Sequence, residues 1–149
     1  MEATTSFHSV LIIDDDMTLR EMYNEYLNAS GFTVISAMDG EEGIAKAKES
    51  KPSAILLDLM MPKMNGIEVL HHLKADDELK NIPVIVFTAL IQDLEKQECF
   101  NAGASDYVVK TEVTPKEILN KINDLITTSE QQTQNQATAP VTPPTQPIV

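Results

Sequence analysis

Aspartates recur in this chain at the points where runs of apolar residues end. Asp14, Asp15 and Asp16 follow the first such run, and Asp58 follows the third. Carboxylates that lie close together repel one another and favour a cation between them. Oxygen ligands with positions left for water and phosphate oxygens suit Mg²⁺, which proteins usually hold through one or two carboxylates. These aspartates therefore predict a magnesium site.

A hydroxyl group and an ammonium group follow two further apolar runs. Thr88 comes directly after the fourth run, and Lys110 directly after the fifth. An aspartate carboxylate can accept a phosphoryl group, and that transfer depends on cations and positioning more than on acids or bases. Lys110 would supply a positive charge, and Thr88 would supply a hydrogen bond to a phosphoryl oxygen. A single polar strand end means little, but the whole set favours phosphoryl transfer to one of the aspartates.

The elements that must position these side chains alternate along the chain. Five short apolar runs, rich in β-branched residues, are typical of strands covered on both faces of a parallel sheet. They are Val10–Ile13, Phe32–Ala37, Ala54–Leu57, Val84–Phe87 and Tyr107–Val109. Amphipathic segments that predict helices follow them, at residues 19–27, after Asp39, and at 67–73, 94–100 and 114–126.

This alternation predicts an α/β fold of the (βα)5 type, a doubly wound parallel sheet of five strands. Right-handed crossovers place helices on both faces of such a sheet. Ligands bind outside the carboxyl ends of its strands, so the polar residues above should meet at one edge. Helix-end signals agree with the pattern: Asp16 is expected to cap the first helix, and Gly31 to follow its end. Thr114 and Glu117 have the spacing of a capping box, with Pro115 between them.

Composition narrows the class of protein. The 149 residues contain 23 acidic and 11 basic side chains, a formal charge of −12, and a single cysteine, Cys99. One cysteine cannot form an internal disulfide, and no apolar run approaches the roughly 18 residues of a membrane span. The acidic balance argues against nucleic-acid binding by this chain alone. We therefore expect a cytoplasmic protein without a membrane segment.

The length allows one domain with an appendage. We expect an N-terminal arm at residues 1–6 and a folded domain at residues 7–128. Residues 129–149 are rich in Gln, Thr, Ala and Pro and carry one charge, Glu130. That composition predicts a disordered tail or linker.

Four motifs in this order resemble the receiver domain of two-component response regulators, including the single-domain regulators of chemotaxis. The motifs are VLIIDD at residues 10–15, ILLDLMMPKMNG at 55–66, VIVFTA at 84–89 and GASDYVVK at 103–110. Their joint spacing is specific, and the resemblance covers residues 7–128. It implies a flavodoxin-like sheet with strand order 2-1-3-4-5.

The same resemblance assigns roles to the site. Asp58 would be the phosphorylated residue. Asp14, Asp15 and Asp58 would hold Mg²⁺ together with the backbone carbonyl of Met60. Independently of the resemblance, Gly66 is expected to help shape the turn before the third helix.

The resemblance also implies how the signal leaves the site. Thr88 and Lys110 would contact the phosphoryl group, and Tyr107 would turn inward as Thr88 moves, although Tyr107 could also simply pack at an edge. The phosphoryl donor would be a sensor histidine kinase or a phosphotransfer protein. An unidentified downstream protein would bind the face formed by residues 94–100, 107–109 and 114–126. The domain would turn over no external substrate, although it would slowly lose its own phosphoryl group.

Two positions depart from the family pattern. Receivers usually carry proline after the lysine, often joined by a cis bond, whereas Thr111 follows Lys110 here. A non-proline cis bond costs about 2.5–4 kcal/mol, so we expect a trans bond or a strained loop. Met60 and Leu90 occupy the two positions that flank the path of hydrolytic water in the family. Their apolar side chains predict a long-lived phosphoryl group.

Other interpretations remain open at this point. An aspartate-dependent phosphatase of the haloacid dehalogenase type would need a second Asp where Met60 stands. A degenerate receiver could act only as a protein-interaction module, and the chain could form the front of a longer DNA-binding regulator. His71 and His72 are adjacent on the third helix and are expected to lie on its surface. Cys99 is expected in the core.

Overall fold

The structure is a computed structural model that describes residues 8–89 and 92–138, with side chains described as far as residue 130. The expected arm at residues 1–6, Leu90, and residues 139–149 lie outside this described part. The limits of the folded domain therefore stay a prediction at both ends.

Five parallel strands form one sheet in the order β2-β1-β3-β4-β5. They are β1 (Ser9–Ile13), β2 (Thr33–Ala37), β3 (Ala54–Leu57), β4 (Val84–Thr88) and β5 (Asp106–Val109). The strand positions agree with the apolar runs to within a residue at each end. The predicted (βα)5 fold and strand order are confirmed.

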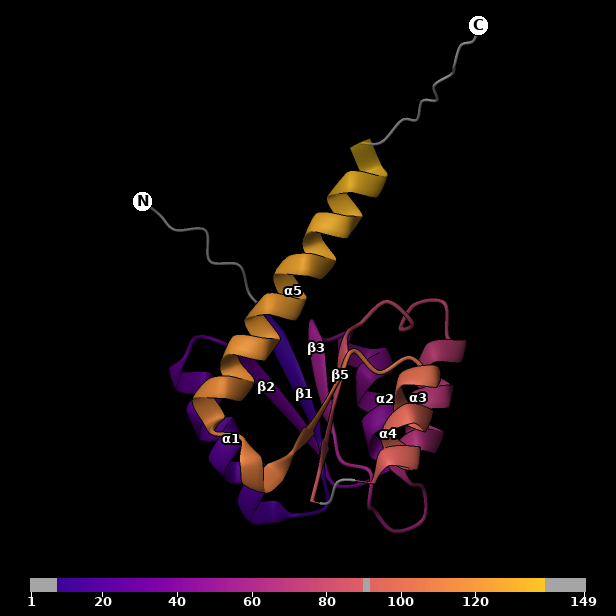
Figure 1. The fold of residues 1–149 in the computed structure, drawn as a ribbon. Coiled ribbons are helices and arrows are strands. Elements are labelled where there is room, and N and C mark those ends of the chain that lie inside the picture. Colours follow the sequence, from indigo (N-terminus) through magenta and orange to yellow (C-terminus); the bar gives the residue numbers. More distant parts are fainter. Residues whose placement is uncertain (1–7, 90–91, 139–149) are drawn as a thin grey trace, which may run out of the picture.

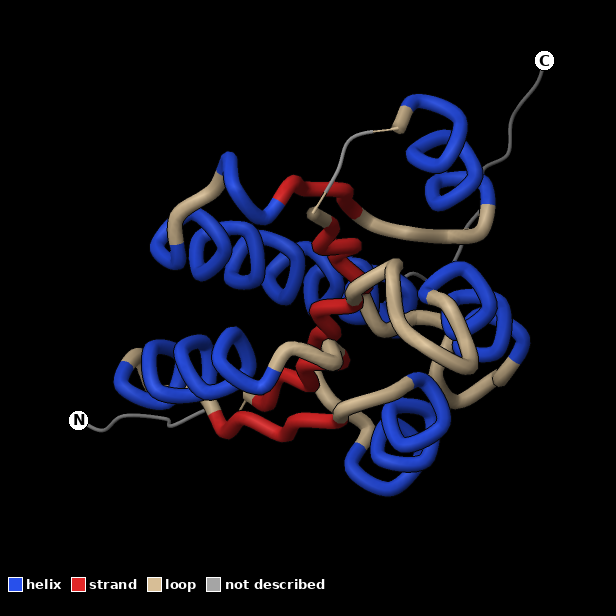
Figure 2. The backbone as a smooth tube through the Cα atoms, turned by 90° about the horizontal axis from the view of Figure 1, so that it is seen from below, coloured by secondary structure: helices blue, strands red, loops and turns tan. Residues whose placement is uncertain are grey.

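Five α-helices and one short 3₁₀ turn connect and cover the strands. They are α1 (Met17–Ala29), α2 (Gly40–Ser50), α3 (Gly66–Ala75), α4 (Asp93–Asn101), the turn η1 (Lys110–Glu112) and α5 (Pro115–Thr138). Helices α1 and α5 lie on one face of the sheet, and α2, α3 and α4 lie on the other (Figures 1 and 2). The sheet is therefore the middle of three layers.

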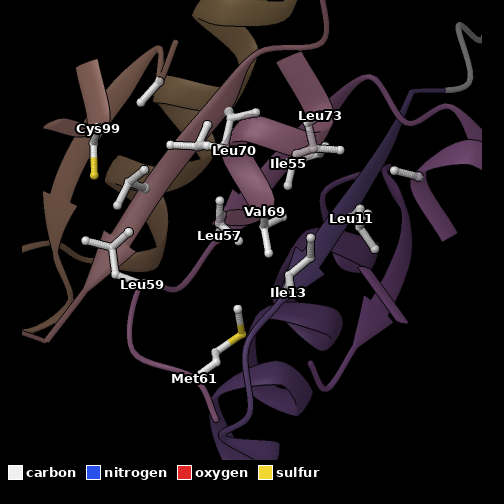
Figure 3. Close-up of a cluster of buried hydrophobic side chains, with 14 of the residues drawn as sticks. Leu11, Ile13, Ile55, Leu57, Leu59, Met61, Val69, Leu70, Leu73 and Cys99 are labelled. Atoms are coloured by element: carbon white, nitrogen blue, oxygen red, sulfur yellow. The ribbon is translucent and has the colours of Figure 1, made fainter. Parts of the chain in front are cut away.

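Two hydrophobic cores result, because successive residues of a strand point to opposite faces. In β1, Val10 and Ile12 pack toward α1 and α5, whereas Leu11 and Ile13 pack toward α2 and α3. All four are almost completely buried. Figure 3 shows part of the second core, including Cys99, which is fully buried as expected. A strand buried on both faces reads as a continuous apolar run, which is why the sequence located the strands well.

The predicted helix ends are also confirmed. The Asp16 carboxylate accepts a hydrogen bond of 3.2 Å from the Leu19 amide, and so caps α1. Gly31 has φ +102°, a left-handed conformation that glycine adopts without steric cost. The Thr114 hydroxyl and the Glu117 carboxylate exchange hydrogen bonds with each other's backbone amides, at 3.2 and 2.8 Å. These caps fix where α1 and α5 begin.

The last helix extends beyond the expected residues 114–126, into the segment from Ser129 for which a tail or linker was predicted. Helix α5 continues to Thr138 and projects past the other elements (Figure 1). Residues 127–138 contain neither Gly nor Pro, the residues that end helices, and the first proline is Pro140. A polar composition argued for disorder, but it does not by itself stop a helix that packing has already started. None of the described helices combines the length and hydropathy that crossing a membrane requires.

Candidate functional site

The register of the two central strands brings the acidic residues together. Ile13 of β1 pairs with Leu57 of β3, so the next residues, Asp14 and Asp58, leave the sheet side by side. The Asp58 amide donates to the Ile13 carbonyl at 2.9 Å, which fixes this step between the strands. Asp15 follows in the loop that leads to α1. The parallel register therefore creates the acidic cluster.

The three carboxylates form a compact cluster. One oxygen from each of Asp14, Asp15 and Asp58 lies within 4.8 Å of the other two. Asp14 is 1% exposed and Asp58 4% exposed, whereas Asp15 is exposed. Two members are thus buried and one faces solvent, so the cluster is open on one side.

Lys110 reaches the cluster from the end of β5. Its Nζ lies 2.8 Å from Asp14 Oδ2 and 3.5 Å from Asp58 Oδ1. The ammonium group also lies 5.7 Å from the centre of the Phe87 ring, a cation–π distance. Lys110 therefore places a positive charge against the two buried carboxylates.

The electrostatics of the site follow from burial and from the close charges. Burial, together with the neighbouring charge of Asp14, raises the pKa of Asp58 from 3.8 to about 6, although Lys110 opposes the shift. Burial acts to lower the pKa of Lys110, but its pairing with Asp14 and Asp58 outweighs this and the net change is upward. One ammonium group thus offsets two buried carboxylates only in part.

Backbone amides hold the two buried carboxylates in place. The Asp16 amide donates to Asp14 Oδ1 at 2.9 Å, and the Met60 amide makes a longer contact of 3.4 Å with Asp58 Oδ1. Gly66, the first residue of α3, packs against the backbone between Asp58 and Leu59. A Cβ atom at position 66 would lie 2.5 Å from the Asp58 carbonyl oxygen, so this turn requires glycine.

Thr88 and Tyr107 lie on the neighbouring strands. Thr88 is fully buried at the end of β4 and pairs in register with Val109, the residue before Lys110. Tyr107 pairs with Val86, is 7% exposed, and belongs to the core beneath α4. The Lys96 ammonium lies 5.9 Å from the Tyr107 ring centre. In this structure Tyr107 is therefore already packed inward.

The donor set fits Mg²⁺. Asp14 Oδ2 is buried without a well-oriented hydrogen bond in the described part of the chain, and its close contact with Lys110 is an ion pair. Three carboxylates supply only oxygen ligands, which a small hard cation prefers. The exposed side of Asp15 leaves room for water and phosphate oxygens.

The structure also shows a contact that sequence reasoning missed. Arg20 of α1 donates from Nη1 to the Asp14 carbonyl oxygen at 2.7 Å. Arg20 is the one arginine of the chain, and its place one turn into the helix after the aspartates was the available signal. The two histidines of α3, His71 and His72, are exposed as expected.

The two departures from the family pattern have different outcomes. No peptide bond in the described residues is cis, so the bond between Lys110 and Thr111 is trans, and Lys110 opens the short turn η1. Met60 is 58% exposed beside the acceptor loop. Leu90 lies outside the described residues.

Comparisons with known proteins identify one family. The family described as "Response regulator receiver domain" matches residues 10–123. The chain is 41% identical over 101 residues, 68% of its length, to the "DNA-binding dual master transcriptional regulator RpaA" of Synechocystis, of which it covers 42%. It is 33% identical over 136 residues, 91% of its length, to the "Transcriptional regulatory protein ResD" of Bacillus subtilis, of which it covers 55%.

Solved structures are similar as well. The chemotaxis response regulator CheY4 of Vibrio cholerae superposes with a TM-score of 0.76 at 29% identity, covering 80% of this chain and 99% of CheY4. The chain thus spans about half the length of the two curated relatives but nearly the whole of the chemotaxis protein. Receiver domains are signalling modules that act with histidine kinases and downstream effectors and bind Mg²⁺ at an acidic pocket. With the matching fold, the acidic cluster and the family match, this chain belongs to the receiver domains of two-component response regulators.

Proposed function

We propose that Asp58 accepts a phosphoryl group from a phosphohistidine of a sensor kinase or a phosphotransfer protein. The observation that carries this proposal is the position of Asp58, buried at the end of β3 beside Asp14 and within 3.5 Å of the Lys110 ammonium. The bond between phosphorus and the donor imidazole nitrogen breaks, and a bond from phosphorus to an Asp58 carboxylate oxygen forms. The imidazole leaves with the electron pair of the broken bond.

Asp14, Asp15 and Asp58, with the Met60 carbonyl, are the proposed holders of Mg²⁺. When bound, this ion neutralises charge on the phosphoryl oxygens and on the carboxylates. Lys110 already lies against both buried carboxylates and is placed to hold a phosphoryl oxygen. Thr88, at the same edge of the sheet, is proposed to donate a hydrogen bond to a second phosphoryl oxygen.

Phosphorylation is proposed to act through a two-state change of the neighbouring elements. Thr88 moves toward the phosphoryl group, and Tyr107 reports that movement. The face formed by α4, β5 and α5 then repacks and binds a downstream protein. Tyr107 is already inward in this structure. The proposed change at this residue is therefore an increase in the population of the inward conformation.

The test is intact mass after incubation with acetyl phosphate, with and without Mg²⁺. The expected result is a gain of one phosphoryl group that requires Mg²⁺ and is lost in Asp58→Asn. Asp16→Asn is the matched control, because it makes the same chemical change two residues from Asp14 while keeping a side chain that can cap α1. No gain in the wild type at any Mg²⁺ concentration would favour a degenerate receiver that only binds other proteins.

A second candidate concerns the protein as a whole. We propose that this receiver forms part of a longer transcriptional regulator, as the printed names of the two curated relatives and their greater length suggest. The similarity to chemotaxis proteins favours a single-domain regulator instead. Sequencing the messenger RNA past the codon for Val149 separates the two, since an in-frame DNA-binding domain would support the first and a stop codon the second.

A further inference from the structure

The backbone at the start of the acidic cluster is held from both sides. The Asp14 amide donates to the Ala37 carbonyl of β2 at 3.1 Å. The Asp14 carbonyl, on the other side, accepts 2.7 Å from the Arg20 guanidinium. This carbonyl belongs to the peptide unit that joins Asp14 to Asp15. Because a peptide unit is planar, fixing its carbonyl also fixes the direction in which Asp15 leaves it.

Asp15 is the member of the cluster that most needs such support. Asp14 and Asp58 are buried, and their carboxylates have amide and lysine contacts. Within residues 8–89 and 92–130, neither a hydrogen bond nor an ion pair holds the exposed Asp15 carboxylate. Its position therefore depends on its own backbone.

We propose that Arg20 is a positioning residue that orients the Asp14–Asp15 peptide and thereby the Asp15 carboxylate for Mg²⁺. The inference rests on the proposed metal site and adds to it a residue from a helix that supplies no ligand. A hydrogen bond from a charged guanidinium is short and strong, and the planar group keeps its direction. At 2.7 Å, the bond from Arg20 is of that kind.

The guanidinium is itself supported within the fold. Arg20 is partly buried in the first turns of α1, where its own amide donates to the Asp16 carbonyl at 3.0 Å. Glu42 of α2 lies close enough for the Arg20 charge to contribute to lowering its pKa, after the larger effects of the Met38 amide and Lys46. Glu42 accepts 2.7 Å from the Met38 amide and pairs with Lys46 at 3.0 Å. Arg20 thus lies between the site and a polar network on the loop after β2.

Two possible effects of Arg20, its positive charge and its hydrogen bond to the Asp14 carbonyl, predict opposite changes in Mg²⁺ affinity when Arg20 is replaced. A cation near the carboxylates repels Mg²⁺, so losing the charge would tighten Mg²⁺ binding. Losing the hydrogen bond to the Asp14 carbonyl would let the peptide turn and would weaken binding. Arg20→Met removes both the charge and the hydrogen bond while keeping much of the length. The direction of its effect therefore identifies which role is dominant.

The experiment measures Mg²⁺ affinity by calorimetry on the unphosphorylated protein. Arg20→Met is expected to weaken binding roughly tenfold, as the loss of residues that orient metal ligands typically does. Arg20→Lys, which keeps a charged donor, is expected to recover part of the loss. Lys46→Met is the matched control, because Lys46 is a cation of the same network that donates to the Ser36 carbonyl instead of Asp14. Its affinity should be unchanged.

Amide hydrogen exchange without Mg²⁺ gives a second measurement. Exchange at the Asp15 amide should become faster in Arg20→Met, while exchange in the middle of β1 stays at the wild-type rate. A loss of protection throughout β1 would instead show general unfolding and would overturn the positioning role. If Arg20→Met does not fold, Arg20→Lys carries the test, with a smaller loss of affinity in the same direction.

Asp15→Asn separates this inference from the proposed function. Wild-type protein that binds no Mg²⁺, or binds it equally well as Asp15→Asn, would overturn the metal site and this inference with it. If Asp15→Asn weakens binding but Arg20→Met binds as tightly as wild type or more tightly, the metal site stands and the role of Arg20 is overturned.

Discussion

The ionised form of Asp58 is disfavoured at its buried position. Burial and the Asp14 carboxylate raise its pKa to about 6, above the ordinary value of 3.8. The folded state therefore holds the Asp58 proton more tightly than the unfolded state. Its contribution to stability is fully present below about pH 4 and is lost as the pH rises through about 6. At neutral pH the ionised Asp58 carboxylate therefore lowers the stability of the metal-free protein.

Asp58→Asn should consequently stabilise the metal-free protein at pH 7.5. The raised pKa of Asp58 corresponds to an increase of about 1–2 kcal/mol in the free energy of unfolding when the charge is removed. Urea unfolding in EDTA measures it, and the difference from wild type should nearly vanish at pH 4. Asp16→Asn, in an exposed position, serves as the control. Equal stabilisation at both pH values would contradict the assigned cause.

Met60 carries the prediction about the lifetime of the phosphoryl group. Its side chain is 58% exposed, two residues after the acceptor, where an apolar group excludes or disorders a hydrolytic water. Met60→Asn should speed loss of the phosphoryl group severalfold, because an amide can orient that water. Intact mass followed over time after removal of the phosphodonor measures the rate. Met38→Asn, at another exposed methionine, is the control, and equal rates for wild type and Met60→Asn would rule the idea out.

Which site residues the sequence predicts depends on how they are held. Asp14, Asp58 and Lys110 follow apolar strands directly, so a parallel sheet brings them together, as the structure shows. Arg20 was missed because its contact joins a helix side chain to a backbone carbonyl. Every residue has a backbone carbonyl that can accept a hydrogen bond, so the residue type at position 14 does not predict that Arg20 will donate to it. The roles of Thr88 and Tyr107 stay predictions.

Helix α3 depends on a close approach that only glycine permits. Gly66→Ala would place a Cβ 2.5 Å from the Asp58 carbonyl oxygen and 2.8 Å from the Leu59 Cα. Forcing this backbone apart should cost about 1–3 kcal/mol and should also weaken Mg²⁺ binding, because the moved backbone carries the acceptor. Urea unfolding and calorimetry measure the two effects.

Gly31→Ala is the comparison for that experiment. Gly31 has open space around it but φ +102°, so alanine there should lower stability through backbone strain alone. Mg²⁺ affinity should remain at the wild-type value. A loss of affinity in Gly31→Ala equal to that in Gly66→Ala would show that stability, not the α3 contact, governs the site.

Element boundaries were predicted best where a cap or a buried run marks them. The box at Thr114 and Glu117 located the start of α5 correctly. Helix α5 runs past the predicted residues 114–126 to Thr138 because residues 127–138 contain neither Gly nor Pro, although they also lack an apolar stripe. In residues 127–138, therefore, neither a stripe of apolar residues that would predict packing nor a Gly or Pro that would predict a helix end is present. Continuation of a helix across such a stretch depends on the helix that precedes it.

The whole molecule should become more stable when Mg²⁺ binds, because the unfolded chain lacks the cluster of Asp14, Asp15 and Asp58. Mass action predicts about 2.7 kcal/mol at a concentration one hundred times the dissociation constant. Thermal unfolding across a Mg²⁺ series measures the effect, with Asp15→Asn as the variant that should respond less. Ca²⁺, a larger ion that prefers more ligands, should give a smaller rise in Tm. A response that Asp15→Asn shares in full would place the ion elsewhere on this acidic chain.

Two aromatic side chains in contact connect the acidic site to a tyrosine whose absorption can be measured. Tyr23 and Phe87 meet edge to face at 5.4 Å, and Phe87 in turn lies under the Lys110 ammonium. The chain has no tryptophan and only three tyrosines, so these tyrosines dominate its near-ultraviolet spectrum, and Tyr23 is one of them. Any event that shifts Lys110 changes the surroundings of Phe87 and, through it, of Tyr23. Difference absorption and circular dichroism near the tyrosine band would then follow occupancy of the acidic site without an added label.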